Sequence, residues 1–290
     1  MNTNARLRQL LKEPGIIVAP GCYDPLTAKL IEHMGFPCAY LSGASVVNTN
    51  LAMPDIGLIT MTEMVTVAKN VASAVKIPVI ADMDTGYGSA LTIQRAVREF
   101  ENAGLAAVHI EDQPMAKRCG HFAGKSVVPA EEMMQRVRAA VEARRDPNFV
   151  IIARTDAIAS EGLEAAIERG RRYAAAGADV LYMEAPRTVE EIRAMPPALP
   201  VPVLIGQPEQ GLSPLVPTRE LEAMGVKIAI YPSSIRLMMM GATFEVLQEL
   251  KEVGTTKRMI PRMGNNELLQ ELLGTPKALD VLGKYSIPDC

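Results

Sequence analysis

Eight short apolar runs alternate with helical patterns, and this alternation constrains the fold of the 290-residue chain more than any other feature. The runs, several of them rich in β-branched residues, cover residues 15–21, 38–41, 78–82, 107–110, 149–153, 179–183, 201–205 and 227–231. Helical patterns lie at 4–11, 24–31, 92–102, 130–143, 162–175 and 189–194. Almost wholly apolar strands that alternate with helices are typical of a parallel sheet covered on both faces. Eight such strands predict an α/β fold of the (β/α)₈ TIM-barrel type.

A doubly wound open sheet is the alternative, but no Gly-x-Gly-x-x-Gly motif follows the first predicted strand. We expect residues 1–290 to form one barrel domain, with residues from about 245 to 290 as a helical C-terminal extension. The extension follows the eighth strand and is not needed to close a barrel. We therefore expect it to pack across a neighbouring subunit of a homo-oligomer.

The composition excludes several classes of function. A net charge of −3 gives no basic footprint for nucleic acid. The four cysteines are scattered without a Cys-x-x-Cys pair, which argues against a zinc cluster or a disulfide framework and fits a reducing compartment. No apolar run approaches membrane-spanning length. These features predict a cytoplasmic protein whose partner is a small molecule.

Acidic residues follow at least four of the predicted strands, at the end where a barrel carries its chemistry. They are Asp82 and Asp84, Glu111 and Asp112, Asp156, and Glu184. Buried together, such carboxylates repel one another and their pKa values rise, which a divalent cation would relieve. All-oxygen ligands suit Mg²⁺ or Mn²⁺ better than Zn²⁺. The alternative for Asp82 and Asp84 is that they cap the next helix, and Asp55, in the long connection after the second strand, is by itself more typical of a turn.

A second group of residues surrounds a thiol. The segment Lys117-Arg118-Cys119-Gly120-His121 places Cys119 between basic residues and a histidine, and nearby positive charge favours a thiolate. This predicts a residue that transfers a proton, with His121 tuning the thiol, and the alternative is a surface loop with an idle cysteine.

Arg154 directly follows the fifth strand, where a bidentate carboxylate clamp is expected. Its alternative is a salt bridge to Glu184 or Asp156. Of the other two histidines, His33 is predicted to lie on the surface and His109 in the core. The run 238–240 of three methionines is interpreted as helix packing.

These motifs, in this order, resemble the isocitrate lyase and phosphoenolpyruvate mutase superfamily. The resemblance rests on residues 41–43, Asp55, and residues 82–88, 109–113 and 153–156, and it extends from residue 19 to residue 232. The segment 117–121 is the mark of the lyase branch, and the chain is most similar to its methylisocitrate and dimethylmalate lyases. The family implies a modified TIM barrel with a helix swapped between subunits, and dimers that pair into tetramers.

The resemblance also implies roles for residues. It implies Mg²⁺ held by Asp82, with Asp55, Asp84 and Glu111 reaching it through water. The residues implied to bind substrate are Tyr40, Ser42, Gly43, Ala44, Gly120, His121 and Arg154, and Ala44 stands where the family usually has glycine. The residues implied in catalysis are Cys119, Arg154, Glu184, His121 and Lys117.

The implied reaction is a retro-aldol cleavage of a 2-hydroxy di- or tricarboxylate, of the methylisocitrate or 2-alkylmalate type, to a 2-oxo acid such as pyruvate and a second carboxylate. Methylisocitrate lyases carry Asn and Thr after the seventh strand to bind that second carboxylate, and this chain has Gly206 and Pro208 there. Either Gln207 or Gln210 replaces them, or the second fragment differs from succinate. An oxaloacetate hydrolase or decarboxylase is the alternative on the same scaffold. A phosphonate mutase and a catalytically silent barrel are less favoured, because neither requires the cysteine segment.

Overall fold

The computed structural model describes residues 2–118, 120 and 124–285. Cys119 and His121, both predicted site residues, lie outside the described residues. The chain divides into two compact units, residues 1–236 and residues 237–290. Within the described ranges, no helix combines the length and the apolar character needed to cross a membrane.

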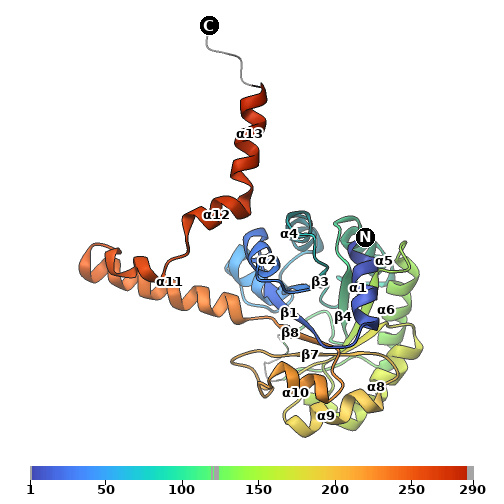
Figure 1. Cartoon of the computed structure of the whole chain (residues 1–290). Coiled ribbons are helices and arrows are strands. Elements are labelled where there is room, and N and C mark those ends of the chain that lie inside the picture. Colours follow the sequence, from blue (N-terminus) through green and yellow to red (C-terminus); the bar gives the residue numbers. More distant parts are fainter. Residues whose placement is uncertain (1, 119, 121–123, 286–290) are drawn as a thin grey trace. The chain divides into compact units, whose positions relative to one another are not determined.

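Eight parallel strands form a closed barrel in sequence order, and β1 pairs with β8 to complete it (Figure 1). The strands are β1 (Ile17–Cys22), β2 (Ala39–Leu41), β3 (Val79–Asp82), β4 (Ala107–Glu111), β5 (Val150–Thr155), β6 (Val180–Met183), β7 (Val203–Gly206) and β8 (Ile228–Tyr231). Each overlaps one of the eight predicted runs, and none extends more than two residues beyond it. The TIM-barrel prediction is therefore confirmed.

Helices connect the strands of the first unit. They are α1 (Thr3–Lys12), α2 (Pro25–His33), α3 (Gly43–Val46), η1 (Val47–Leu51), α4 (Met61–Ala74), α5 (Ala90–Asn102), α6 (Ala130–Ala143), α7 (Ile158–Glu161), α8 (Leu163–Ala175), α9 (Val189–Ala198) and α10 (Thr218–Ala223). Helices α3, η1, α4 and α7 were not predicted from the sequence. Of these, α4 begins with a capping box between Thr60 and Glu63.

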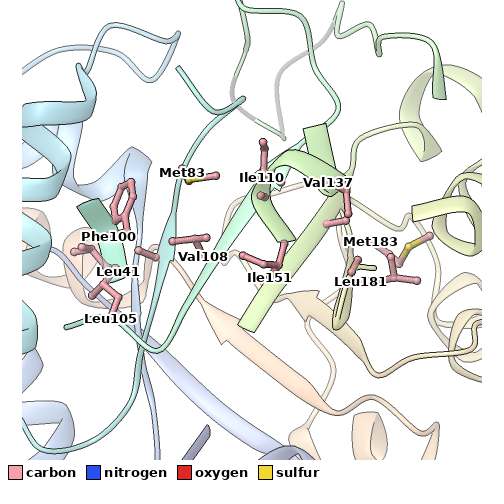
Figure 2. Packing of buried hydrophobic residues seen from close by; sticks show 14 of the residues in the cluster. Leu41, Met83, Phe100, Leu105, Val108, Ile110, Val137, Ile151, Leu181 and Met183 are labelled. Atoms are coloured by element: carbon pink, nitrogen blue, oxygen red, sulfur yellow. The ribbon is translucent and has the colours of Figure 1, made fainter. Parts of the chain in front are cut away.

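Two apolar clusters hold the barrel together. One lies between the strands and the helices, and Figure 2 shows Phe100 and Val137 of the helical layer with Val108 and Ile151 of the strands. Complete burial of a side chain such as Phe100 contributes roughly 1.5–3 kcal/mol. The other cluster is formed by alternate strand residues facing the barrel interior, together with Leu7 of α1. This interior packing leaves the carboxyl ends of the strands as the place for polar side chains.

The second unit contains most of α11 (Ser234–Val253), followed by η2 (Lys257–Arg262), α12 (Asn266–Leu273) and α13 (Thr275–Tyr285). Helix α11 ends at Val253, and Gly254 follows it with a φ of +74°. Pro261 lies inside η2 and does not interrupt it. The helix also begins at Ser234, earlier than the predicted start at 245, because the apolar pattern continues directly from the end of β8. The methionines at 238–240 lie on α11 and are exposed within the single chain.

Candidate active site

Asp82 ends β3 and lies against the start of α3. Ser42 caps this short helix, and a Cβ atom added to Gly43 would lie 2.6 Å from Oδ2 of Asp82. Position 43 therefore has to be glycine for the carboxylate to approach the backbone so closely. The backbone N–H of Asp84 donates to Oδ1 of Asp82 over 2.9 Å, and Asp84 itself has a φ of +47°. Ser42, Gly43 and the two aspartates thus come together, as the sequence predicted, with the partly exposed Ala44 next along α3.

Lys117 carries a buried ammonium group into this acidic cluster. Its Nζ atom lies 2.6 Å from Oδ1 of Asp55 and 2.6 Å from Oδ1 of Asp84. Burial raises the pKa of Asp84 to about 6, against the opposing charge of Lys117. Burial alone would lower the pKa of Lys117, but the surrounding carboxylates, led by Asp84 and Glu111, raise it well above its ordinary value. Asp55 is thereby joined to the site by an ion pair.

Glu111, at the end of β4, is fully buried, and both of its carboxylate oxygens lack a hydrogen-bond partner. Burial raises the pKa values of Glu111 and Asp82. Among the described residues, no three His, Cys, Asp or Glu side chains are already arranged as metal ligands. The chemistry of the set nevertheless fits a hard divalent cation, because it consists of buried carboxylate oxygens, two of them without a hydrogen bond. The predicted metal residues therefore lie in one region.

Arg154, near the end of β5, lies among three carboxylates. Its Nε and Nη2 atoms donate to Asp156 over 2.9 and 3.1 Å, as a bidentate pair. Nε is 3.4 Å from Glu111, and Nη2 is 3.7 Å from Glu184. Burial opposes the charge on Arg154, but Asp156 and Glu184 hold its pKa well above the ordinary value. The salt-bridge interpretation of Arg154 is confirmed, and a contact between Arg154 and substrate stays a prediction.

Gly120, in the connection after β4, lies over this cluster. A Cβ atom on Gly120 would overlap the Glu184 carboxylate and the Arg154 guanidinium group, so only glycine fits there. Nζ of Lys125 donates to the carbonyl of Gly120 and lies 2.8 Å from Oδ1 of Asp156. Lys117 and Gly120, on either side of residues 118 and 119, are thus both fixed at the barrel mouth.

Aromatic and imidazole rings form the floor of the site. The Tyr40 hydroxyl and Nε2 of His109 share a hydrogen bond of 2.7 Å, and the Tyr182 ring meets the His109 ring edge-on at 5.5 Å. Burial lowers the pKa of His109 to about 3, so the imidazole is neutral. His109 is a core histidine, as predicted, and His33 is exposed.

Sequence reasoning missed Tyr182 and Lys125 as site residues. Tyr182 lies two residues before Glu184, and strand alternation places both on one face, so a signal for Tyr182 existed. Lys125 follows a stretch without periodicity and gave no such signal. A cavity of about 360 Å³, lined by residues 57–62 together with Asp84, Tyr87 and Lys117 among others, adjoins the acidic cluster.

Comparison with known proteins assigns the family. The family model described as phosphoenolpyruvate phosphomutase matches residues 7–251. The chain belongs to this family. It is 41% identical over 286 residues to 2,3-dimethylmalate lyase of Eubacterium barkeri, which covers 99% of both chains. It is 42% identical over 268 residues to 2-methylisocitrate lyase of Aeropyrum pernix, covering 92% of this chain and 86% of the relative. With lyases as relatives over nearly its whole length, the chain is a carbon–carbon lyase.

Two solved structures extend the comparison. Oxaloacetate acetylhydrolase in complex with 3,3-difluorooxalacetate superposes with a TM-score of 0.91 at 37% identity, over 98% of this chain and 97% of the other. Phosphonopyruvate hydrolase in complex with oxalate and Mg²⁺ superposes with a TM-score of 0.89 at 31% identity, over 98% and 99%. A protein solved with bound Mg²⁺ therefore shares the fold of this chain.

Proposed function

We propose that this lyase cleaves the C2–C3 bond of a 2-hydroxy di- or tricarboxylate of the 2-alkylmalate or methylisocitrate type. The products are a 2-oxo acid, such as pyruvate, and a second carboxylate. One observation carries the proposal. The acidic cluster around Asp82 and Glu111 meets the Arg154–Glu184 pair, through the contact of Arg154 with Glu111, beneath Gly120. Cation-binding and carboxylate-binding groups are needed side by side for this reaction.

Separate groups of residues would bind the substrate and the cation. Ser42, Gly43 and Ala44 bind the 2-hydroxy acid end, with Tyr40 beneath them. Asp82, with Asp55, Asp84 and Glu111, would hold Mg²⁺, and Mn²⁺ suits the same oxygens. When bound, the cation polarises the 2-hydroxyl group and the C1 carboxylate.

Cleavage moves one proton away from oxygen and another onto carbon. The 2-hydroxyl group gives its proton to a carboxylate of the site, its oxygen forms the 2-oxo group, and the C2–C3 electron pair remains on C3. Cys119 then gives its thiol proton to C3, while Lys117 and His121 set the charge around the thiol. Arg154 and Glu184 flank the breaking bond. The anchoring of Gly120 over this pair supports the role given to Cys119, because the segment then excludes water from C3.

The test is a substrate panel with Mg²⁺ present. 2,3-Dimethylmalate, 2-methylisocitrate, other 2-alkylmalates and oxaloacetate are each incubated with the enzyme, and 2-oxo acid release is followed. We expect 2-oxo acid from at least one hydroxy acid, and loss of activity after exhaustive EDTA treatment. The Cys119→Ser variant should lose activity, with Cys38→Ser as the control for a buried thiol outside the site. No release from any hydroxy acid would refute the proposal.

A second candidate is hydrolysis of oxaloacetate, favoured by the similarity to oxaloacetate acetylhydrolase. The same panel separates the two functions, because hydrolysis would release oxalate from oxaloacetate and leave the hydroxy acids intact.

We also propose a cytoplasmic homotetramer built as a dimer of helix-swapped dimers, with residues 237–290 as the exchanged segment. The exposed apolar side chains of this segment, such as Phe244 and Leu282, support an interface. Light scattering of the full chain and of a chain ending at residue 236 would test this assembly, because the molar mass gives the number of subunits. The same number of subunits for both chains would exclude the exchange.

A further inference from the structure

Gly206 ends β7 directly beside the hydroxyl group of Tyr182 on β6. A Cβ atom added to Gly206 would lie 2.8 Å from the Tyr182 oxygen, whereas the nearest ring carbon, Cζ, would lie at 3.6 Å. The first distance is too short for a relaxed contact and the second is ordinary van der Waals contact. A side chain at position 206 and a hydroxyl at position 182 therefore exclude each other. The two residues compete for one space at the barrel mouth.

Tyr182 cannot readily yield that space. The residue is 3% exposed, and its ring lies 5.1 Å from the guanidinium carbon of Arg154 and 5.5 Å from the His109 ring. Its hydroxyl group is hydrogen-bonded to Glu184, and burial followed by the charge of Glu184 raises the pKa of Tyr182. The hydroxyl group is therefore neutral at every ordinary pH, and its partner is the Glu184 carboxylate of the protein.

The neighbouring side chains of the loop after β7 do not supply a cation or a free amide. Gln207 is fully buried, and it accepts from the backbone N–H of Val216 over 2.7 Å and donates to the carbonyl of Gly206 over 3.3 Å. Gln210 is exposed. Glu209 accepts from Ser233 over 2.9 Å and adds negative charge. Neither glutamine therefore stands in for an asparagine at position 206.

Arg154 is the nearest cation to Tyr182, and its charge is balanced by Asp156, Glu111 and Glu184. A third carboxylate, brought to this end of the site by a long substrate, would meet Glu184 with little compensating charge left from Arg154. Burying a charge without a partner is costly, whereas an alkyl group beside an aromatic ring is favourable.

We infer, on the basis of the proposed function, that the Tyr182–Gly206 pair selects the substrate's second fragment. The C3 carbon then carries a small uncharged alkyl group, and the substrate is a 2-hydroxy dicarboxylate with an alkyl group at C3. A tricarboxylate, with a carboxylate-bearing arm at C3, is disfavoured. Tyr182 acts in this as a specificity residue, with no proton transferred.

A four-protein cycle tests the inference: the wild type, Tyr182→Phe, Gly206→Asn and the double variant. The value of kcat/KM is measured with 2,3-dimethylmalate and with 2-methylisocitrate in the presence of Mg²⁺. The wild type should prefer the dicarboxylate at least about tenfold. Gly206→Asn alone should lose activity on both acids and lower the Tm, because the asparagine collides with the Tyr182 oxygen. The double variant should regain the Tm and shift the preference at least about tenfold towards the tricarboxylate.

Tyr231→Phe is the matched control, because this hydroxyl-bearing residue at the end of β8 lines an apolar cavity with Leu30 and Met34 instead. It should leave the preference unchanged. Equal cleavage of both acids by the wild type would overturn the inference while leaving the proposed function in place. Additive effects of the two substitutions on Tm and on preference would also overturn it. Cleavage of neither acid, and of no other hydroxy acid, would instead overturn the proposed function and this inference together.

Discussion

The ammonium nitrogen of Lys117 lies 2.6 Å from Oδ1 of Asp84, inside the group of carboxylates that would hold a divalent cation. It makes an equally short contact with Asp55. An ammonium group and a metal ion both neutralise carboxylates, so the presence of one lowers the affinity of the same carboxylates for the other. Lys117 therefore links the cysteine segment to the charge state of the site.

Replacing Lys117 with methionine should tighten the binding of Mn²⁺ or Mg²⁺ at least about tenfold, because a competing positive charge is removed from buried carboxylates. Isothermal titration of the metal-free protein measures this directly, without substrate. Lys69→Met, at an exposed position on α4, is the control and should leave the affinity unchanged. An unaltered affinity in the Lys117 variant would show that the ammonium group and the cation do not compete.

Gly120→Ala should lower kcat/KM by about 100-fold, because its Cβ atom would displace the segment from Arg154 and Glu184. The Tm should change little, since the barrel core does not include this segment. Gly241→Ala serves as control, because nothing lies within 4 Å of an added Cβ atom there. Wild-type kinetics for Gly120→Ala would mean that the segment does not sit over the pair during turnover.

His109 should make the protein less stable as the pH falls. Its pKa is lowered by burial to about 3 in the folded chain, against an ordinary value near 6.5. The unfolded chain therefore binds a proton first, and the stability from neutral His109 is complete above pH 6.5 and is lost as the pH decreases towards 3. Asp84 acts in the opposite sense, because its pKa is raised to about 6 and its contribution is lost as the pH rises through that value.

Comparison with a His109→Gln variant isolates the histidine. The free energy of unfolding of the metal-free wild type, relative to the variant, should fall by about 2 kcal/mol between pH 8 and pH 5. Urea unfolding at several pH values gives this difference. Parallel pH profiles for the two proteins would show that His109 gains a proton in the folded state as readily as in the unfolded state.

The fold was predictable because each apolar run had to be covered on both faces, which left few arrangements for eight strands. The helix ends were predictable where a glycine marks them, as after α5 and α8, where Gly104 and Gly177 have positive φ angles. The helix α4 was missed although its buried residues Met64, Ala68 and Val71 recur at helical spacings of four and three. Local pattern alone therefore gave the architecture but missed α4 and short helices such as α3 and α7.

The site was predictable only at the strand ends. Residues at the carboxyl end of a strand, such as Asp82 and Arg154, could be placed because the barrel gathers strand ends. The pairing of Lys117 with Asp55 could not, since both lie in long connections whose paths depend on tertiary contacts. The role of Gly206 was visible only as a departure from the family, and its reason, the Tyr182 hydroxyl, lies on another strand.

Lys125 provides the last prediction. Its Nζ atom joins Asp156, at the end of β5, to the carbonyl of Gly120, and its side chain is 2% exposed. Asp156 keeps a bidentate pair with Arg154 when the lysine is removed, so the barrel should remain folded. What is lost is the anchor that holds Gly120 over Glu184.

We expect Lys125→Met to lower kcat/KM by about tenfold to 100-fold with a small change in Tm, and Lys125→Arg to recover part of the loss. Steady-state kinetics and thermal unfolding measure both, with the exposed Lys76→Met as control. Full activity of Lys125→Met would show that Gly120 is held by its contacts with Arg154 and Glu184 alone.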